Sequence, residues 1–250
     1  MDIKIMLIMP LAFFCEFIDS TLGMGYGTTL TPLLLIFGFE PMQVVPAVLL
    51  SEFVSGIIAA FFHHSIENVV FKKDSQDTKV AIVLSLFAVI GTILAVFLAV
   101  KLSPKILKIW IGFIVVSMGI LILALYKFKQ KFSWKKIILL GTIASFNKGM
   151  SGGGYGPVVM GGQVLSGINV KNAVGVTSLS EGVTCLVGVI LYSCTQKIVD
   201  WSLSPWLMAG AVLSVPVAAH TLKRIPEKKA KIIASIIILI LGCVTLIKAF

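Results

Sequence analysis

The sequence contains few charged residues. Asp, Glu, Lys and Arg make up only 13% of the chain and apolar residues 58%, whereas soluble domains have about 25% charged and about 45–50% apolar residues. A chain of 250 residues with a mean hydropathy of +1.03 lacks the polar side chains that would cover a water-exposed surface. The sequence therefore excludes a soluble globular protein. It predicts a polytopic membrane protein with the lipid bilayer as its main partner.

Acidic residues are scarcer than basic ones. The chain has 11 Asp and Glu against 21 Lys and Arg, which gives a formal net charge of +10. Nucleic-acid-binding proteins share such an excess. Here, however, the basic residues form short runs between apolar segments, as they do in the cytoplasmic loops of membrane proteins. We therefore expect no nucleic-acid partner.

Motifs for redox or metal chemistry are also missing. The four cysteines form no CxxC pair, and Cys15, Cys185 and Cys243 lie within apolar segments, where free thiols act as small apolar side chains. His63 and His220 lie near the ends of apolar segments, which is typical of interfacial residues. We expect no enzyme activity, no cofactor and no metal site.

The most informative feature is a glycine cluster that occurs twice. A shift of 129 positions places Gly25-Tyr26-Gly27 on Gly154-Tyr155-Gly156, and the same frame places Ser51-Glu52 on Ser180-Glu181. That frame also aligns Phe17 with Phe146, Gly23 with Gly152, Gly38 with Gly167, Val45 with Val174 and Val54 with Val183. A random overlay would not keep all these matches without a gap. The chain therefore consists of two copies of one unit.

The two copies contain the same series of apolar segments. The first copy, 1–126, has a broken run at 5–38 and single segments at 42–63, 80–100 and 106–126. A polar cytoplasmic linker at 127–136 follows. The second copy, 137–250, has a broken run at 137–168 and single segments at 172–193, 203–221 and 230–247. Each single segment is close to the ~20 residues that a spanning helix needs. Each broken run is too long for one span, and each of its arms is too short. We expect the first run to belong to the mature protein and not to be a signal peptide. Tyr192 lies near a segment end, and we expect it to be an anchor at the membrane interface.

The basic residues indicate whether each broken run crosses the membrane. Apart from Lys148, which lies inside a run, 20 basic residues remain. If both runs cross, these residues divide 11 against 9. If both runs turn back as hairpins, they divide 14 against 6: the 14 lie within 72–79, 127–136 and 223–231 and at 171, and the 6 lie within 101–108 and at 4, 197 and 248. The second division is the asymmetry that the positive-inside rule expects.

A hairpin followed by three spans changes sides an odd number of times. The second copy therefore enters the membrane in the opposite orientation. The predicted fold is an all-α polytopic membrane protein with two inverted repeats, each a glycine-broken helical hairpin plus three transmembrane helices. We expect a multi-pass protein of the cell membrane with both termini outside.

The glycine breaks are candidate anion sites. Backbone N–H groups at a glycine turn form a cradle for anions, and a helix that begins after the turn directs its positive N-terminus there. The candidate binding residues are Gly23, Gly25, Tyr26, Gly27 and Thr28 in the first copy and Lys148, Ser151, Gly152, Gly153, Gly154 and Tyr155 in the second. The alternative is that the glycines only allow close helix packing.

Charged residues inside apolar segments are the second signal. A lysine at the depth of Lys148 costs at least ~3 kcal/mol unless it is compensated, by a carboxylate or by an anionic substrate. Its counterpart in the first copy is Asp19, so we expect either an Asp19–Lys148 pair or a lysine that contacts substrate. Glu52 and Glu181 occupy equivalent positions near the middle of single spans. An ionised carboxylate is costly there, which suits proton coupling, with Asp19 as a third candidate, or else a protonated carboxyl that bonds a neighbouring helix end.

These motifs resemble those of the sulfite exporter TauE/SafE family of membrane transporters. The resemblance rests on residues 23–32, 151–156 and 173–179 and extends over essentially the whole chain. It implies transport of small sulfur-containing anions such as sulfite, sulfonates or thiosulfate, often linked to protons. Tyr26, which interrupts the first glycine run, and Pro157, which follows the second, depart from the family pattern. We therefore expect a secondary transporter of a small anion that works by alternating access. The alternative is a cation or metal-ion transporter that uses the intramembrane carboxylates.

Overall fold

The computed structural model describes residues 3–125, 132–196, 199–222 and 227–249. These residues form ten helices and no strand: α1 Ile3–Leu22, α2 Tyr26–Ile36, α3 Pro41–Ser65, α4 Gln76–Ala99, α5 Pro104–Leu125, α6 Trp134–Ser151, α7 Tyr155–Leu165, α8 Val170–Gln196, α9 Ser204–Thr221 and α10 Glu227–Ala249. Half of the linker predicted at 127–136, residues 127–131, lies outside the described residues. The protein is an all-helical, polytopic membrane protein.

Each glycine cluster ends one helix and precedes the next, at backbone angles that glycine adopts readily. Between α1 and α2, Gly23 has φ +70° and Gly25 has φ +135°. Between α6 and α7, Gly152 has φ +70° and Gly154 has φ +81°. Side chains with a Cβ rarely adopt these angles, so the glycines allow the chain to turn sharply inside an apolar region.

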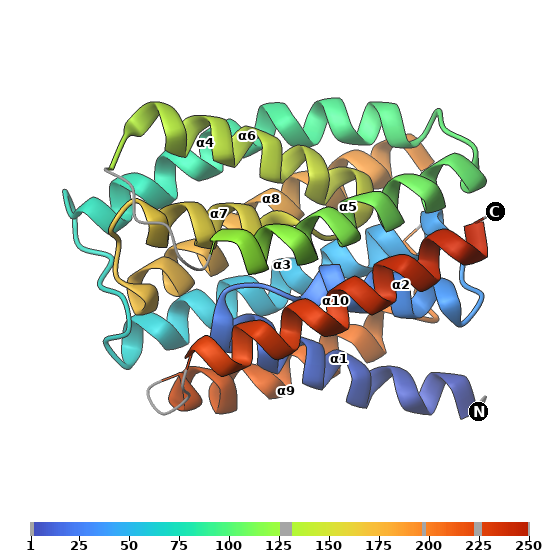
Figure 1. Ribbon diagram of the computed structural model, residues 1–250, viewed down its shortest axis with the longest axis horizontal. Coiled ribbons are helices and arrows are strands. Elements are labelled where there is room, and N and C mark those ends of the chain that lie inside the picture. Colours follow the sequence, from blue (N-terminus) through green and yellow to red (C-terminus); the bar gives the residue numbers. More distant parts are fainter. Residues whose placement is uncertain (1–2, 126–131, 197–198, 223–226, 250) are drawn as a thin grey trace.

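The direction of the helices is visible in Figure 1, where both chain ends lie on the right. Helix α2 runs back to the side from which α1 starts, and α3 then crosses to the left. Helices α6 and α7 form a similar hairpin that starts and ends on the left. We call the side of the chain ends, with residues 37–40, the terminal face, and the side of the α3–α4 connection, residues 66–75, the opposite face.

Four of the described helices are long and apolar enough to cross a membrane. They are α3, α4, the 104–121 part of α5, and α8. Large apolar side chains on these and neighbouring helices point outward, among them Phe14, Phe61, Leu86, Phe113 and Ile240. An outer surface of this kind would be unstable in water and fits the acyl chains of a bilayer.

Helices α3 and α8 cross closely at the centre of the molecule. A Cβ added at Gly56 of α3 would lie 3.0 Å from the carbonyl oxygen of Ser178 and 3.2 Å from the Cα of Gly182, both on α8. Small residues let two backbones approach in this way. The crossing brings the part of α3 that carries Glu52 against the part of α8 that carries Glu181.

Candidate substrate and coupling site

The two glycine breaks touch each other at the centre of the protein. The backbone N–H of Gly154 donates a hydrogen bond to the Thr28 hydroxyl oxygen at 3.0 Å. A Cβ at Gly27 would overlap the carbonyl oxygen of Gly152, and one at Gly156 would lie 2.5 Å from that of Gly23. The turns therefore meet backbone against backbone, which only glycine permits. We call each of these turns, together with the last helical turn before it, a tip: the two tips are residues 19–27 and 148–156.

Lys148 lies in the last turn of α6, within the second tip, and only 1% of its side chain is exposed. Its ammonium group contacts the Glu52 carboxylate and lies 2.7 Å from Oε1 of Glu181. Of the two alternatives that the sequence left open for Lys148, the pair with Asp19 is not formed: within the described part of the chain, its ion-pair partners are the two glutamates. Glu52 and Glu181 therefore compensate the buried ammonium instead of bonding a helix end.

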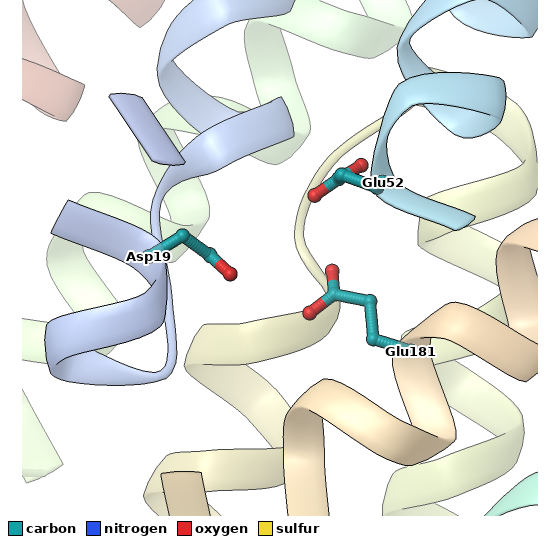
Figure 2. A group of neighbouring side chains, drawn as sticks. All are labelled: Asp19, Glu52 and Glu181. Atoms are coloured by element: carbon teal, nitrogen blue, oxygen red, sulfur yellow. The ribbon is translucent and has the colours of Figure 1, made fainter. Parts of the chain in front are cut away.

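Asp19 lies beside this pair and bonds the start of α2. Its Oδ1 accepts a hydrogen bond of 3.1 Å from the backbone N–H of Tyr26, the first residue of that helix. A carboxylate in this position interacts favourably with the helix dipole. Figure 2 shows Asp19, Glu52 and Glu181 directed toward one another, and each has an oxygen within 4.8 Å of those of the other two. Three such carboxylates could hold a metal ion, but the Lys148 ammonium already supplies a positive charge to two of them.

The sequence analysis left Glu16 out of the candidate site, although it belongs to the same cluster. Its oxygens accept hydrogen bonds from the Ser20 hydroxyl at 2.6 Å and the Ser55 hydroxyl at 3.1 Å. A small cavity, with room for about one water molecule, is lined by Glu16, Asp19, Glu52, Ser55, Gly56, Ser178 and Glu181. Helical spacing could have indicated both serines, because Ser55 lies three residues after Glu52 and Ser178 three before Glu181.

The hydroxyl groups of the tips bond protein atoms. The Tyr26 hydroxyl and the Ser51 hydroxyl are 2.7 Å apart, and both residues are fully buried. Ser151 donates to the Asn147 carbonyl and accepts from the backbone N–H of Gly153. Tyr155 is also fully buried; its hydroxyl makes no well-formed hydrogen bond among the described residues, but the hydroxyls of Ser180 and Thr184 lie near it. The expected donors thus lie at the tips, where the Thr28 hydroxyl bonds the other tip, the Ser151 hydroxyl bonds its own tip and the Tyr26 hydroxyl bonds α3.

Residues 149–153 have the Gly-x-Ser-x-Gly spacing of a hydrolase nucleophile turn. Ser151, however, ends helix α6, and its hydroxyl bonds only backbone groups. A hydrolase serine follows a strand and bonds a histidine. The spacing therefore arises from the glycine tip and gives no reason to expect hydrolysis.

Two residues that the sequence placed at the membrane interface are buried. His63 and Tyr192 are fully enclosed, and each bonds the last turn of a hairpin helix. The prediction was wrong for both because hydropathy locates helix ends along the sequence. It does not reveal which neighbouring helices cover them.

The side chains around Lys148 include more acidic than basic groups. Glu16, Asp19, Glu52 and Glu181 face a region that holds one ammonium group, so full ionisation would leave three uncompensated negative charges away from water. Unpaired charges are very costly in such surroundings. The cluster is therefore suited to bind protons or to exchange partners around Lys148.

Comparison with known proteins identifies the family of this chain. The sequence profile described as "Sulfite exporter TauE/SafE" matches residues 8–245. The "Probable membrane transporter protein YtnM" of Bacillus subtilis (strain 168) is 29% identical over 241 residues, which cover 90% of this chain and 77% of that protein. Both are described as membrane transporters. The chain belongs to the sulfite exporter TauE/SafE family.

Proposed function

We propose that this protein is a secondary transporter of a small sulfur-containing anion, of the sulfite, sulfonate or thiosulfate class, and that its transport is linked to protons. The observation that carries the proposal is the buried Lys148 ammonium beside the contact between the tips, held by two carboxylates. The name of the family supports the class of anion.

Two positive features near the tips are occupied by carboxylates of the protein. Glu52 and Glu181 occupy the Lys148 ammonium, and Asp19 occupies the N-terminus of α2. A substrate anion can replace these carboxylates with its own oxygens. The glycine N–H groups and the hydroxyls of Thr28 and Ser151 would complete its binding site.

Such an exchange requires protons. When the anion binds the Lys148 ammonium, Glu52 and Glu181 lose their cation in a region without bulk water. Ionised carboxylates are costly there, so these groups bind protons as the anion arrives. Asp19 does the same when the anion displaces it from α2. Anion binding and proton binding therefore favour each other, which is the thermodynamic requirement for coupled transport.

The two halves would work as inverted repeats that rock around the tips. The central cavity takes about one water molecule, so the tips must separate before a sulfur oxyanion can enter. The opposite directions of the α1–α2 and α6–α7 hairpins suit a site that opens to each face in turn. We place the protein in the cell membrane with both termini outside, on the basis of the basic residues in its loops.

The second candidate function is transport of a cation or metal ion. The observation that favours it is the close group of Asp19, Glu52 and Glu181. The Lys148 ammonium stands against it, because a bound cation would have to displace that ammonium from both glutamates.

Heating purified protein in detergent tests the proposal. Sulfite, thiosulfate or a taurine-like sulfonate at about 100 times its Kd should stabilise the protein by about 2.7 kcal/mol. For a chain of this size that raises Tm by roughly 5–10 °C. Because the anion brings protons with it, the stabilisation should grow as the pH falls. A sulfonate is the best anion for the pH series, since its own charge does not change.

Two variants provide the control. Lys148→Ala should abolish the stabilisation by anions. Lys108→Ala should leave it unchanged, because Lys108 forms a partly exposed ion pair with Glu40 away from the tips. If none of the three anions raises Tm of the unaltered protein while a divalent cation does, the second candidate function replaces the first.

A further inference from the structure

We propose that His63 and Tyr192 are two latches, one in each copy, which close the central site toward opposite faces of the membrane. This inference rests on the proposed alternating-access function. The two residues occupy equivalent positions, 11 residues after Glu52 and 11 residues after Glu181. Each bonds the tip region of the hairpin in its own copy.

The two contacts are equivalent down to the atom that accepts the hydrogen bond. His63 Nε2 lies 3.0 Å from the carbonyl oxygen of Ser20, and the Tyr192 hydroxyl donates to that of Gly149 at 2.8 Å. Ser20 follows Asp19, and Gly149 follows Lys148. Each latch therefore holds the residue next to the charged side chain of its tip.

The accepting carbonyls are free because the hairpin helices end there. The last four carbonyls of a helix have no partner within it. The Asp19 and Lys148 carbonyls are satisfied by the N–H groups of Gly23 and Gly152 in the glycine turns. The next carbonyl in each helix is the one that its latch binds. Two different side chains, a histidine and a tyrosine, thus satisfy the same backbone group in the two copies.

Asn68 determines which nitrogen of the His63 ring carries the proton. The Asn68 side-chain nitrogen lies 3.0 Å from His63 Nδ1 and 3.1 Å from the Ala219 carbonyl oxygen. Since the amide donates at both contacts, Nδ1 is an acceptor and Nε2 carries the proton that reaches Ser20. The arrangement also ties the end of α3 to α9.

The latches lie on different sides of the tips. His63 is near the end of α3 at the opposite face, and the α1–α2 hairpin that it holds enters from the terminal face. Tyr192 is near the end of α8 at the terminal face, and the α6–α7 hairpin enters from the opposite face. Each latch thus holds its tip from the side that the hairpin does not enter. Releasing it would give water a route to the charged cluster from that side alone.

Two native cysteines report such a route. Cys15 lies one helical turn before Asp19 and Cys185 one turn after Glu181, and both thiols are buried near the charged cluster. The exposed Cys194 and Cys243 are first replaced by serine. A membrane-impermeant maleimide is then applied to intact cells and to inside-out vesicles, which present opposite faces of the protein.

His63→Leu should raise the labelling rate about fivefold from the opposite face, the effect of one lost hydrogen bond on an opening equilibrium, and leave labelling from the terminal face unchanged. Tyr192→Phe, which removes one oxygen atom, should do the reverse. His63→Gln keeps a side-chain N–H and should restore most of the protection. His220→Leu is the control, because His220 bonds Pro216 within its own helix.

The opposite sidedness of the two variants is the result that the proposal requires. Equal labelling of each variant from both faces would mean that the bonds only stabilise the fold, and no change in either variant would mean that they close nothing. If His63→Leu does not fold, Tyr192→Phe alone still tests the one-sided effect. Labelling does not depend on the transported anion, so the latches can fail while the anion proposal holds, and the reverse.

Discussion

The tip of the first hairpin carries Asp19, whereas the equivalent position of the second carries Lys148. Glu16, one turn earlier, likewise corresponds to Ser145. The backbones differ much less: Gly23 and Gly152 both have φ +70°, and Gly38 and Gly167, after the hairpins, have φ +98° and +86°. The duplicated backbone thus brings two turns together, and the two copies differ in the charged side chains that stand there.

This difference has a physical reason. Two identical tips would place like charges against each other at the centre of the bilayer, where repulsion is hardly screened. A lysine on one tip avoids this repulsion and binds Glu52 of the first copy and Glu181 of the second. The same ammonium therefore joins the two copies. An anion that binds the ammonium would break this connection between the two copies. Anion binding would therefore allow the copies to move relative to each other.

Exchanging the charges of the two tips should have the largest effect. Lys148→Asp gives both tips the same residue and leaves Glu52 and Glu181 without a cation. The loss of one partner from a buried ion pair costs about 3–5 kcal/mol, which lowers Tm by roughly 10 °C. The double variant Asp19→Lys/Lys148→Asp returns an ammonium to the cluster from the other tip and should recover at least half of this loss.

Melting curves of the two single variants and the double variant measure this coupling. Lys108→Ala, at a partly exposed ion pair, is the control and should cost at most about 1 kcal/mol. If the double variant is as unstable as the sum of its single variants, the tips are not interchangeable and the comparison between the copies fails.

The sequence was sufficient to locate the tips but not to assign the partners of Lys148. Glycines that match in one frame, such as Gly25 and Gly154, indicate turns that recur, and in the structure these turns touch. The choice between Asp19 and the glutamates depends on how far α6 is rotated against α3 and α8. Periodicity within one helix does not contain that angle, so the sequence left Asp19 and a substrate as alternative partners of Lys148 and did not indicate the two glutamates.

The roles of Glu16, His63 and Tyr192 could not be predicted for a related reason. Glu16 has no acidic counterpart in the second copy, and His63 and Tyr192 are different residue types at one equivalent position. A search for identical residues therefore passes over all three. Comparing the two copies by position and by the atom that each side chain bonds would have related His63 to Tyr192.

Substitution of the tip glycines should have an intermediate effect. A Cβ at Gly27 would overlap the Gly152 carbonyl, and one at Gly156 would lie 2.7 Å from the Met24 Cα. Backbone atoms cannot move aside cheaply, so Gly27→Ala and Gly156→Ala should each cost about 2–3 kcal/mol. Gly38→Ala is the control: no atom lies within 4 Å, and only its φ of +98° opposes a side chain, for about 1–2 kcal/mol. Tm values that are equal for tip and control variants would show that the tips do not require their close contact.

Removal of the tip hydroxyls should have the smallest effect and should differ between the copies. Tyr26→Phe removes the bond to Ser51 and leaves a buried hydroxyl unpaired, which costs about 1–2 kcal/mol. Tyr155→Phe removes a buried hydroxyl that lies near those of Ser180 and Thr184 but makes no well-formed hydrogen bond among the described residues, so it should cost less than about 1 kcal/mol. Tm of the two purified variants, measured side by side, checks the difference. If Tyr155→Phe is as destabilising as Tyr26→Phe, the Tyr155 hydroxyl has a partner of its own, and the two tips are more alike in their bonding than in their charge.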